Sequence, residues 1–314
     1  MYRSHRQRVV AALVSMGMAA LLAACGSGME QRPSSERAEA PRSERVAQPY
    51  DIFLGERLGA INYGVLQVRD VCLVKRGYTY TRQQAVGRRP TNPFEGLQVS
   101  AASFGLASEA RARSHGFGTD LPAEPPSLIS YDVNFDKAVE ECWSDAWRQL
   151  GTDGKQTYDS YSELGGKLND ALVPVFQVKP PAEVTTTMLD CVTGMGFTVS
   201  DRAGWITDYD VRGFGVEFGT WEQPAGGEWR PKEVPGTVAV GPATPAKRYV
   251  PTEGEVRLAV AWFQCDTRVG LTKWIFDQAI AAERRAVDRH EAELVELNPR
   301  IEELARMAAE MVGR

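Results

Sequence analysis

The chain has 314 residues, of which 43% are hydrophobic, and it carries 36 basic and 41 acidic side chains for a formal net charge of -5. This length suffices for one large or two small folded domains. An acidic chain without a cluster of basic and interleaved aromatic residues is poorly suited to contact phosphate backbones, so no nucleic acid partner is expected.

The first 25 residues have the three regions of a secretory signal. Three arginines lie among the first eight residues, an apolar stretch covers residues 9–22, and small residues precede Cys25. Because the apolar stretch is shorter than the roughly 20 residues that cross a bilayer, we expect residues 1–24 to be a cleaved signal peptide and not a permanent membrane helix.

The run Leu22-Ala23-Ala24-Cys25-Gly26 resembles the lipobox of bacterial lipoproteins. The resemblance implies that Cys25 becomes the first mature residue and carries lipid, which anchors the protein on the outer face of the cell membrane. Two or more acyl chains anchor a protein stably, whereas one does not. The alternative is an ordinary secreted protein whose signal happens to end in cysteine.

A disordered tether is expected over residues 25–48. This stretch is rich in Ser, Pro, Arg and Glu and has almost no bulky apolar side chains, so it cannot offset the entropy cost of folding. A flexible chain of this length has an end-to-end distance of about 25 Å. Removal of residues 1–24 leaves 33 basic and 41 acidic residues, a net charge of -8.

Four cysteines remain in the mature chain, and an even number in an exported protein indicates two disulfides. They are Cys72, Cys142, Cys191 and Cys265. No two of them have the close spacing of a zinc site, and the mature chain has only two histidines. We therefore expect structural cysteines and no metal.

The cysteines belong to an internal repeat. The pattern C-x4-G-aromatic-T begins at Cys72 and again at Cys191, and each copy is followed about 70 residues later by an Ala-x3-Cys pattern, at Cys142 and Cys265. Two cognate units are indicated. Of the three possible connectivities, the repeat favours Cys72 with Cys142 and Cys191 with Cys265.

Apolar residues spaced three and four positions apart predict helices, which glycine or proline ends. The predicted helices cover residues 54–72, ended by Gly77, 136–150, ended by Gly151, 160–176 and 182–194. They predict a mainly α fold, a disulfide-bonded helical bundle of two related halves over residues 49–155 and 156–250, with a small hairpin and loop insertion and a very long C-terminal helix.

The insertion is expected between Trp205 and Tyr249, where Gly and Pro are frequent and Val211 to Phe218 reads as a β-strand in a hairpin. Aromatic rings in its loops form a candidate surface for a glycan or a peptide. The alternative is that these rings pack the hairpin onto the bundle. The candidate ligand residues are Trp205, Tyr209, Trp221 and Trp229.

Residues 251–314 are expected to form the long C-terminal helix. A pattern like a capping box opens it at Thr252 and Glu255, and little interrupts it until Pro299. At 1.5 Å per residue, Thr252 to Leu297 would span roughly 65 to 70 Å, so part of it is expected to project.

Beyond Pro299, a heptad-like apolar stripe and two ion pairs, Glu296 with Arg300 and Glu302 with Arg306, resemble a short coiled-coil arm. One interpretation is a docking face for an envelope protein partner. The other is a helix that folds back on the bundle.

Sequence motifs of catalysis and cofactor binding are absent: there is no G-x-S-x-G, P-loop, H-E-x-x-H or Rossmann glycine pattern. His115 and His290 lie among charged or helix-end positions, where a solvated role is expected. We therefore expect no catalytic residues, no cofactor and no enzyme activity. A hydrolase assembled from residues far apart in the sequence is the remaining alternative.

Several segments together resemble a group of actinobacterial lipoproteins without an established activity. The resemblance rests on the doubled C-x4-G-aromatic pattern, on Phe104-Gly105-Leu106 with Gly116-Phe117, and on Ala259-x-Ala261-x3-Cys265, and spans most of residues 54–312. It implies a lipid-anchored, disulfide-bonded, helical envelope protein and says nothing about a substrate.

The function expected from the sequence is therefore that of a non-enzymatic adaptor or scaffold in the cell envelope. Lipid on Cys25 would hold it at the membrane, and the C-terminal helix would reach an envelope protein. The alternative is an extracytoplasmic module that binds a glycan or a peptide through the aromatic loops of residues 205–229.

Overall fold

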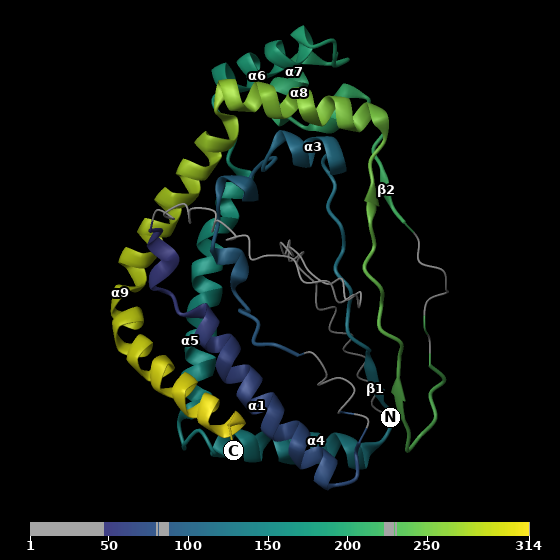
Figure 1. Ribbon diagram of the computed structural model, residues 1–314. Coiled ribbons are helices and arrows are strands. Elements are labelled where there is room, and N and C mark those ends of the chain that lie inside the picture. The colour runs from purple at the N-terminus through teal and green to yellow at the C-terminus, as the bar shows by residue number, and fades with distance from the viewer. Residues whose placement is uncertain (1–46, 80, 82–87, 223–228, 230, 314) are drawn as a thin grey trace, which may run out of the picture. The chain divides into compact units, whose positions relative to one another are not determined.

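A computed structural model describes residues 47–79, 81, 88–222, 229 and 231–313, which belong to one compact unit, Ala47–Arg314 (Figure 1). The predicted signal peptide, Cys25 and the tether up to residue 46 lie outside the described residues.

The fold is mainly α, as predicted. The α-helices are α1 (Gly55–Lys75), α3 (Glu109–His115), α4 (Val133–Arg148), α5 (Gly154–Leu172), α6 (Ala182–Gly194), α7 (Arg202–Asp208), α8 (Glu253–Val269) and α9 (Leu271–Val312). Short 3₁₀ helices are η1 (Pro49–Ile52), η2 (Glu95–Leu97), η3 (Ala101–Ser103), η4 (Val173–Gln177) and η5 (Val211–Phe214). The strands are β1 (Leu128–Ser130), β2 (Thr220–Trp221), β3 (Val238–Val240) and β4 (Tyr249–Val250).

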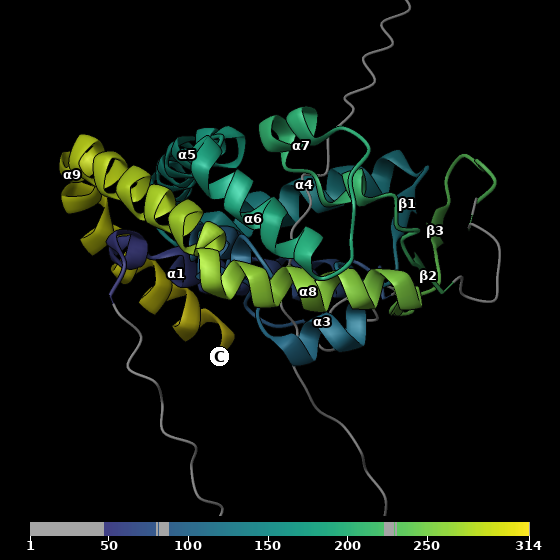
Figure 2. The ribbon, with the colours of Figure 1, turned by 90° about the horizontal axis from the view of Figure 1, so that it is seen from above.

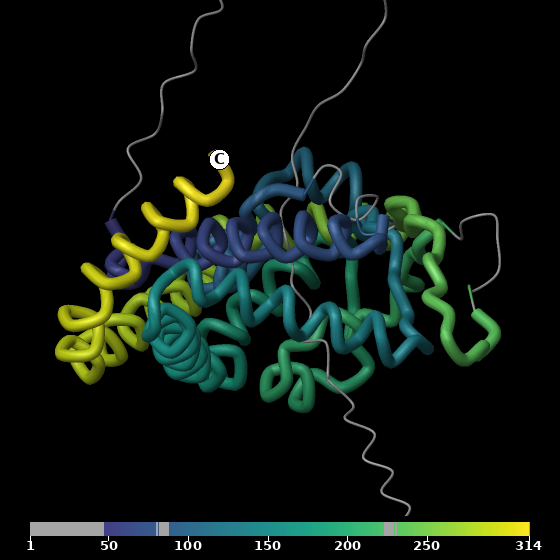
Figure 3. The backbone as a smooth tube through the Cα atoms, turned by 90° about the horizontal axis from the view of Figure 1, so that it is seen from below, coloured from purple at the N-terminus to yellow at the C-terminus, as the bar shows by residue number. Residues whose placement is uncertain are grey.

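The largest apolar core lies where α9 packs along α1 and α5 (Figure 1). α1 and α4 run side by side, as the view from below shows (Figure 3). At the other end of the unit, α8 lies between α3 and α6 (Figure 2). The division expected between residues 155 and 156 falls inside α5.

The two disulfides have the predicted pairing. Cys72 of α1 is bonded to Cys142 of α4, and Cys191 of α6 to Cys265 of α8, each with Cα atoms 5.7 Å apart. Each disulfide therefore joins one pair of packed helices.

The repeated C-x4-G-aromatic pattern has the same local structure in both copies. Gly77 and Gly196 have φ angles of 95° and 93°, a left-handed conformation that glycine adopts easily at a helix end. The next residue folds back: the Tyr78 N–H donates to the Leu73 carbonyl at 3.0 Å, and the Phe197 N–H donates to the corresponding carbonyl of Val192. The repeat thus encodes a disulfide-bonded helix and its end.

The very long C-terminal helix is confirmed as α9, but its predicted start at Thr252 is wrong, because the chain breaks at Gly270. This glycine has a φ angle of 78° and ends α8. The Asp266 carboxylate accepts the Thr272 N–H at 2.8 Å and so caps the first turn of α9. Pro299 does not end the helix, since α9 continues to Val312, with a kink at His290.

The C-terminal segment folds back on the bundle and does not project. Its apolar stripe, Leu294, Leu297, Ile301, Leu304 and Ala308, is buried, and α9 contacts α1 and α5 over this region. The ion pair predicted between Glu302 and Arg306 is replaced: Glu302 pairs with Arg57 of α1 at 3.0 Å, whereas Arg306 pairs with Glu303 and Glu310.

The strand predicted from Val211 to Phe218 is also wrong. Val211–Phe214 is a 3₁₀ helix that Gly215 ends with a φ angle of 65°. The chain forms strands elsewhere: β1 pairs antiparallel with β3, and β2 with β4. Isolated bridges join Leu121 to Lys247 and Glu124 to Thr244, so these extended segments run from the α8 end to the α4 end (Figure 1).

None of the helices in the described part of the chain has the length and apolar content that crossing a membrane requires.

The approach of α9 to α1 can be tested at Gly64, where an added Cβ would lie 2.9 Å from the Cβ of Ala308. Gly64→Ala should lower the free energy of unfolding by about 1–3 kcal/mol, because the methyl group overpacks this contact. Gly166→Ala, at an α5 position with no atom within 4 Å, should raise it by about 0.4–1 kcal/mol. Denaturant unfolding with the disulfides intact measures both, and equal effects would contradict the close approach.

Candidate functional site

Trp205 is not a ligand-facing residue, because its ring is only 4% exposed. It packs against Phe214 and Trp262, with ring centroids 5.5 and 6.1 Å away, and its Nε1–H donates to the Asp210 carbonyl at 2.8 Å. This ring fixes α7 and η5 onto α8, which agrees with the alternative that the aromatic residues serve packing.

Tyr209 follows the end of α7 with a φ angle of 41°, a left-handed backbone that is uncommon outside glycine. Its hydroxyl lies 3.5 Å from the Val178 carbonyl, and burial raises the pKa of that hydroxyl. Its ring packs against the main core, so the residue contributes to packing.

Trp221 and Trp229 occupy two further environments. Trp221 is 42% exposed, its Nε1–H donates to the Thr119 carbonyl at 2.8 Å, and its ring packs edge-on against Tyr249. Trp229 covers Gly241, where an added Cβ would lie 2.6 Å from a ring carbon. In the described residues, the four predicted aromatic side chains do not form one surface.

A fully buried carboxylate, that of Glu255, holds together three segments that are distant in the sequence. It accepts the Phe117 N–H at 2.8 Å, the Gly219 N–H at 2.7 Å and the Tyr249 hydroxyl at 3.0 Å. Burial raises the pKa of the Tyr249 hydroxyl to about 12, and the hydrogen bond to the carboxylate contributes in the same direction. The carboxylate thus joins the residues after α3 and before β2 to the start of α8, which is a structural role.

Only half of the predicted capping box is present at this helix start. The Thr252 hydroxyl accepts the Glu255 N–H at 3.0 Å, as expected, but the Glu255 side chain turns away from Thr252 to its buried partners.

Glu255→Gln should lower the free energy of unfolding by about 1.5–3 kcal/mol, because the amide replaces a charged acceptor and brings two buried N–H donors beside backbone N–H groups. The matched control is Glu253→Gln, two residues before Glu255, which removes an exposed ion pair with Arg257. It should change the free energy of unfolding by less than about 1 kcal/mol. Chemical denaturation measures both, and a Glu255→Gln effect as small as that of the control would contradict the structural role.

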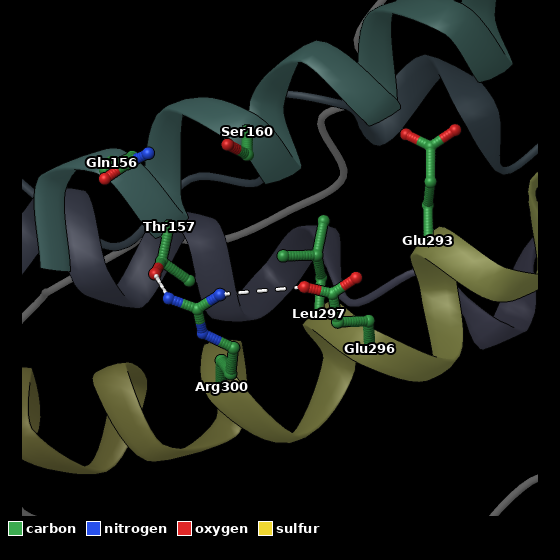
Figure 4. A pocket seen from close by; sticks show the side chains of 7 residues that line it. All are labelled: Gln156, Thr157, Ser160, Glu293, Glu296, Leu297 and Arg300. Atoms are coloured by element: carbon green, nitrogen blue, oxygen red, sulfur yellow. Dashed lines mark hydrogen bonds and ion pairs between the residues drawn. The ribbon is translucent and has the colours of Figure 1, made fainter. Parts of the chain in front are cut away.

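The candidate binding site is a groove of about 320 Å³ between α5 and α9 (Figure 4). Buried Leu297 lies at its base, and the other side chains are polar. The lining residues are Gln156, Thr157, Ser160, Glu293, Glu296, Leu297 and Arg300.

Ion pairs join α5 to α9 on both sides of the groove. The Arg300 guanidinium donates to the Thr157 hydroxyl at 2.6 Å and the Asp153 carboxylate at 2.8 Å. About two turns back along α9, Glu293 accepts a hydrogen bond from the Lys167 ammonium of α5 at 3.1 Å. Hydrogen bonds from His290 and Lys167 lower the pKa of Glu293, so this carboxyl is ionised at neutral pH.

Two acidic residues and one basic residue line the groove, so its lining carries a net charge of -1, and we refer to it as the acidic groove. The Glu296 side chain is 73% exposed and lies 3.9 Å from Arg300, which confirms the predicted pairing of these two residues. Gln156 and Ser160 are exposed on the facing wall. Such a groove can accept hydrogen bonds from a cationic or amide-bearing segment. In the sequence, only the spacing of Glu296 and Arg300 pointed to this groove, because α5 and α9 are far apart along the chain.

No three His, Cys, Asp or Glu side chains of the described residues are arranged to hold a metal ion. The chain matches no known protein family, no curated protein and no solved structure. The residues and their geometry therefore carry the functional proposal.

Proposed function

We propose that this chain is a lipid-anchored protein on the outer face of the cell membrane that acts as a non-enzymatic adaptor or scaffold. The lipobox-like run ending at Cys25 supports the anchor, as does the resemblance to actinobacterial lipoproteins. The two disulfides support export, because such bonds persist in oxidising compartments.

The acidic groove between α5 and α9 is the observation that carries the adaptor role. It lies on the C-terminal helix, which packs on the bundle and so presents a fixed surface. Its exposed Glu296 and the facing Gln156 and Ser160 suit a lysine- or arginine-bearing segment of an envelope protein.

The disulfides suit a scaffold that keeps its shape outside the cell. They close loops of 70 and 74 residues, which in the chain-entropy model stabilises the folded state by about 4 kcal/mol each. The groove itself is held by the apolar packing of α9 on α5 and by the Lys167–Glu293 and Arg300–Asp153 ion pairs.

A photoreactive amino acid in place of Ser160, in living cells, should crosslink to a basic segment of an envelope protein. The same photoreactive amino acid in place of Asp170, which is exposed on the same helix but does not line the groove, should give no crosslink to this partner. Glu296→Lys should abolish the crosslink by charge reversal, whereas Glu303→Lys, on the same helix outside the groove, should preserve it. Mass spectrometry identifies the crosslinked peptide.

Two results would contradict this proposal. A crosslink that survives Glu296→Lys would place the partner elsewhere. If a clickable fatty acid fed to the cells labels the Cys25→Ser protein as strongly as the unsubstituted protein, Cys25 is not the lipid attachment site.

A further inference from the structure

The Cys72–Cys142 disulfide lies in a second groove, of about 290 Å³, between α1 and α4, which we call the disulfide groove. Both cysteines line it. Cys72 is partly exposed, whereas Cys142 is fully buried, so Cys72 is the cysteine open to attack from the groove. The other residues that line this groove are Val68, Val71, Lys75, Arg76, Asp145 and Gln149.

The Cys191–Cys265 disulfide is more firmly enclosed. Cys265 is fully buried in the largest apolar core, where its sulfur lies 3.9 Å from the Met195 sulfur, and Cys191 packs against the same core. The first disulfide belongs instead to a small separate core, whose buried residues are Leu73, Phe135, Ala138 and Cys142. Because fewer apolar contacts hold this small core, the junction of α1 and α4 opens at a lower free energy than the main core does.

The lining of the disulfide groove carries a positive charge. It contains Lys75, Arg76 and Asp145, a net charge of +1, in a chain that is acidic overall. Arg76 pairs with Glu141 and Asp145 with Arg148, and the net charge is still +1 when these two partners are counted. Exposed Lys75 has no ion-pair partner among the described residues. A free ammonium beside the disulfide attracts an anion and stabilises a thiolate.

We propose that the Cys72–Cys142 disulfide is a site of exchange with small anionic thiols, and that the Cys191–Cys265 disulfide is not. The inference depends neither on the lipid anchor nor on the adaptor role. A thiolate in the groove attacks the Cys72 sulfur and forms a mixed disulfide, and the Cys142 sulfur leaves as a thiolate that takes a proton from water. A second thiol then attacks the reagent sulfur of the mixed disulfide and releases the Cys72 thiol. Two thiols are thus oxidised to one disulfide while the protein disulfide is reduced.

Exchange at this site would remove the covalent link between α1 and α4 and leave the other links of the fold in place. The disulfide between α6 and α8 stays closed, and apolar packing and ion pairs between α5 and α9 hold the acidic groove. The α1–α4 junction would then respond to thiols outside the cell without loss of the acidic groove.

The test uses the full chain with Cys25→Ser, so that only the four bonded cysteines can react. This parent chain is kept under native conditions with 2-mercaptoethanesulfonate, an anionic thiol, and the freed cysteines are alkylated at set times and located by mass spectrometry. Cys72 and Cys142 should be freed at least about ten-fold faster than Cys191 and Cys265, because only a small core has to open. Equal rates, or faster release of Cys191 and Cys265, overturn the proposal.

The charge of the thiol is tested with cysteamine, a cationic counterpart, at equal thiolate concentration. The anionic thiol should reduce the Cys72–Cys142 disulfide roughly two- to five-fold faster, a ratio that falls with added salt. Lys75→Gln should lower this ratio. The matched control, Lys137→Gln, removes an equal charge from α4 outside the groove and should preserve it. A ratio of one in the parent chain, or equal loss in both variants, overturns the assignment of anionic thiols.

Discussion

Helix α9 is held along α1 and α5 by apolar packing, and the acidic groove between α5 and α9 depends on it. Leu294, Ile301 and Ala308 turn inward, and the glycine at position 64 lets the backbones of α1 and α9 approach closely. Once the inner face is fixed, helical geometry fixes the outer one. The acidic groove, which lies beyond the kink at His290, is therefore presented by a fixed face of α9.

The opposite end of the unit is stabilised by different means. Its helices are joined by the Cys191–Cys265 disulfide and by the buried Glu255 carboxylate, which draws the residues after α3 and before β2 onto the start of α8. A buried carboxylate is tolerated only when its oxygens are hydrogen-bonded, and here two backbone N–H groups and one hydroxyl donate to it. Apolar packing dominates at α9, whereas covalent and polar contacts add to it at α8.

Features that depend on neighbouring residues were predictable from the sequence. The ends of α1 and α4 at Gly77 and Gly151 follow from the backbone freedom of glycine, and the cysteine pairing follows from the repeat. The break at Gly270 was missed, because a glycine inside a helical pattern is often tolerated at a cost of about 1 kcal/mol. The Asp266 carboxylate, which accepts the Thr272 N–H, stabilises the helix break at Gly270. The partners of the Glu255 carboxylate lie 138 and 36 residues away along the chain. Such contacts leave no local signal.

Zero-length carbodiimide coupling tests most directly that the C-terminal helix lies on the bundle and forms the groove with α5. We expect a crosslink between Lys167 of α5 and Glu293 of α9, whose charged atoms are 3.1 Å apart, and its loss in Glu293→Gln. The link between Lys155 and Asp159 within α5 is the internal control. If the control link forms and the Lys167–Glu293 link does not, the helix is not held on α5, and the groove and its proposed role are contradicted.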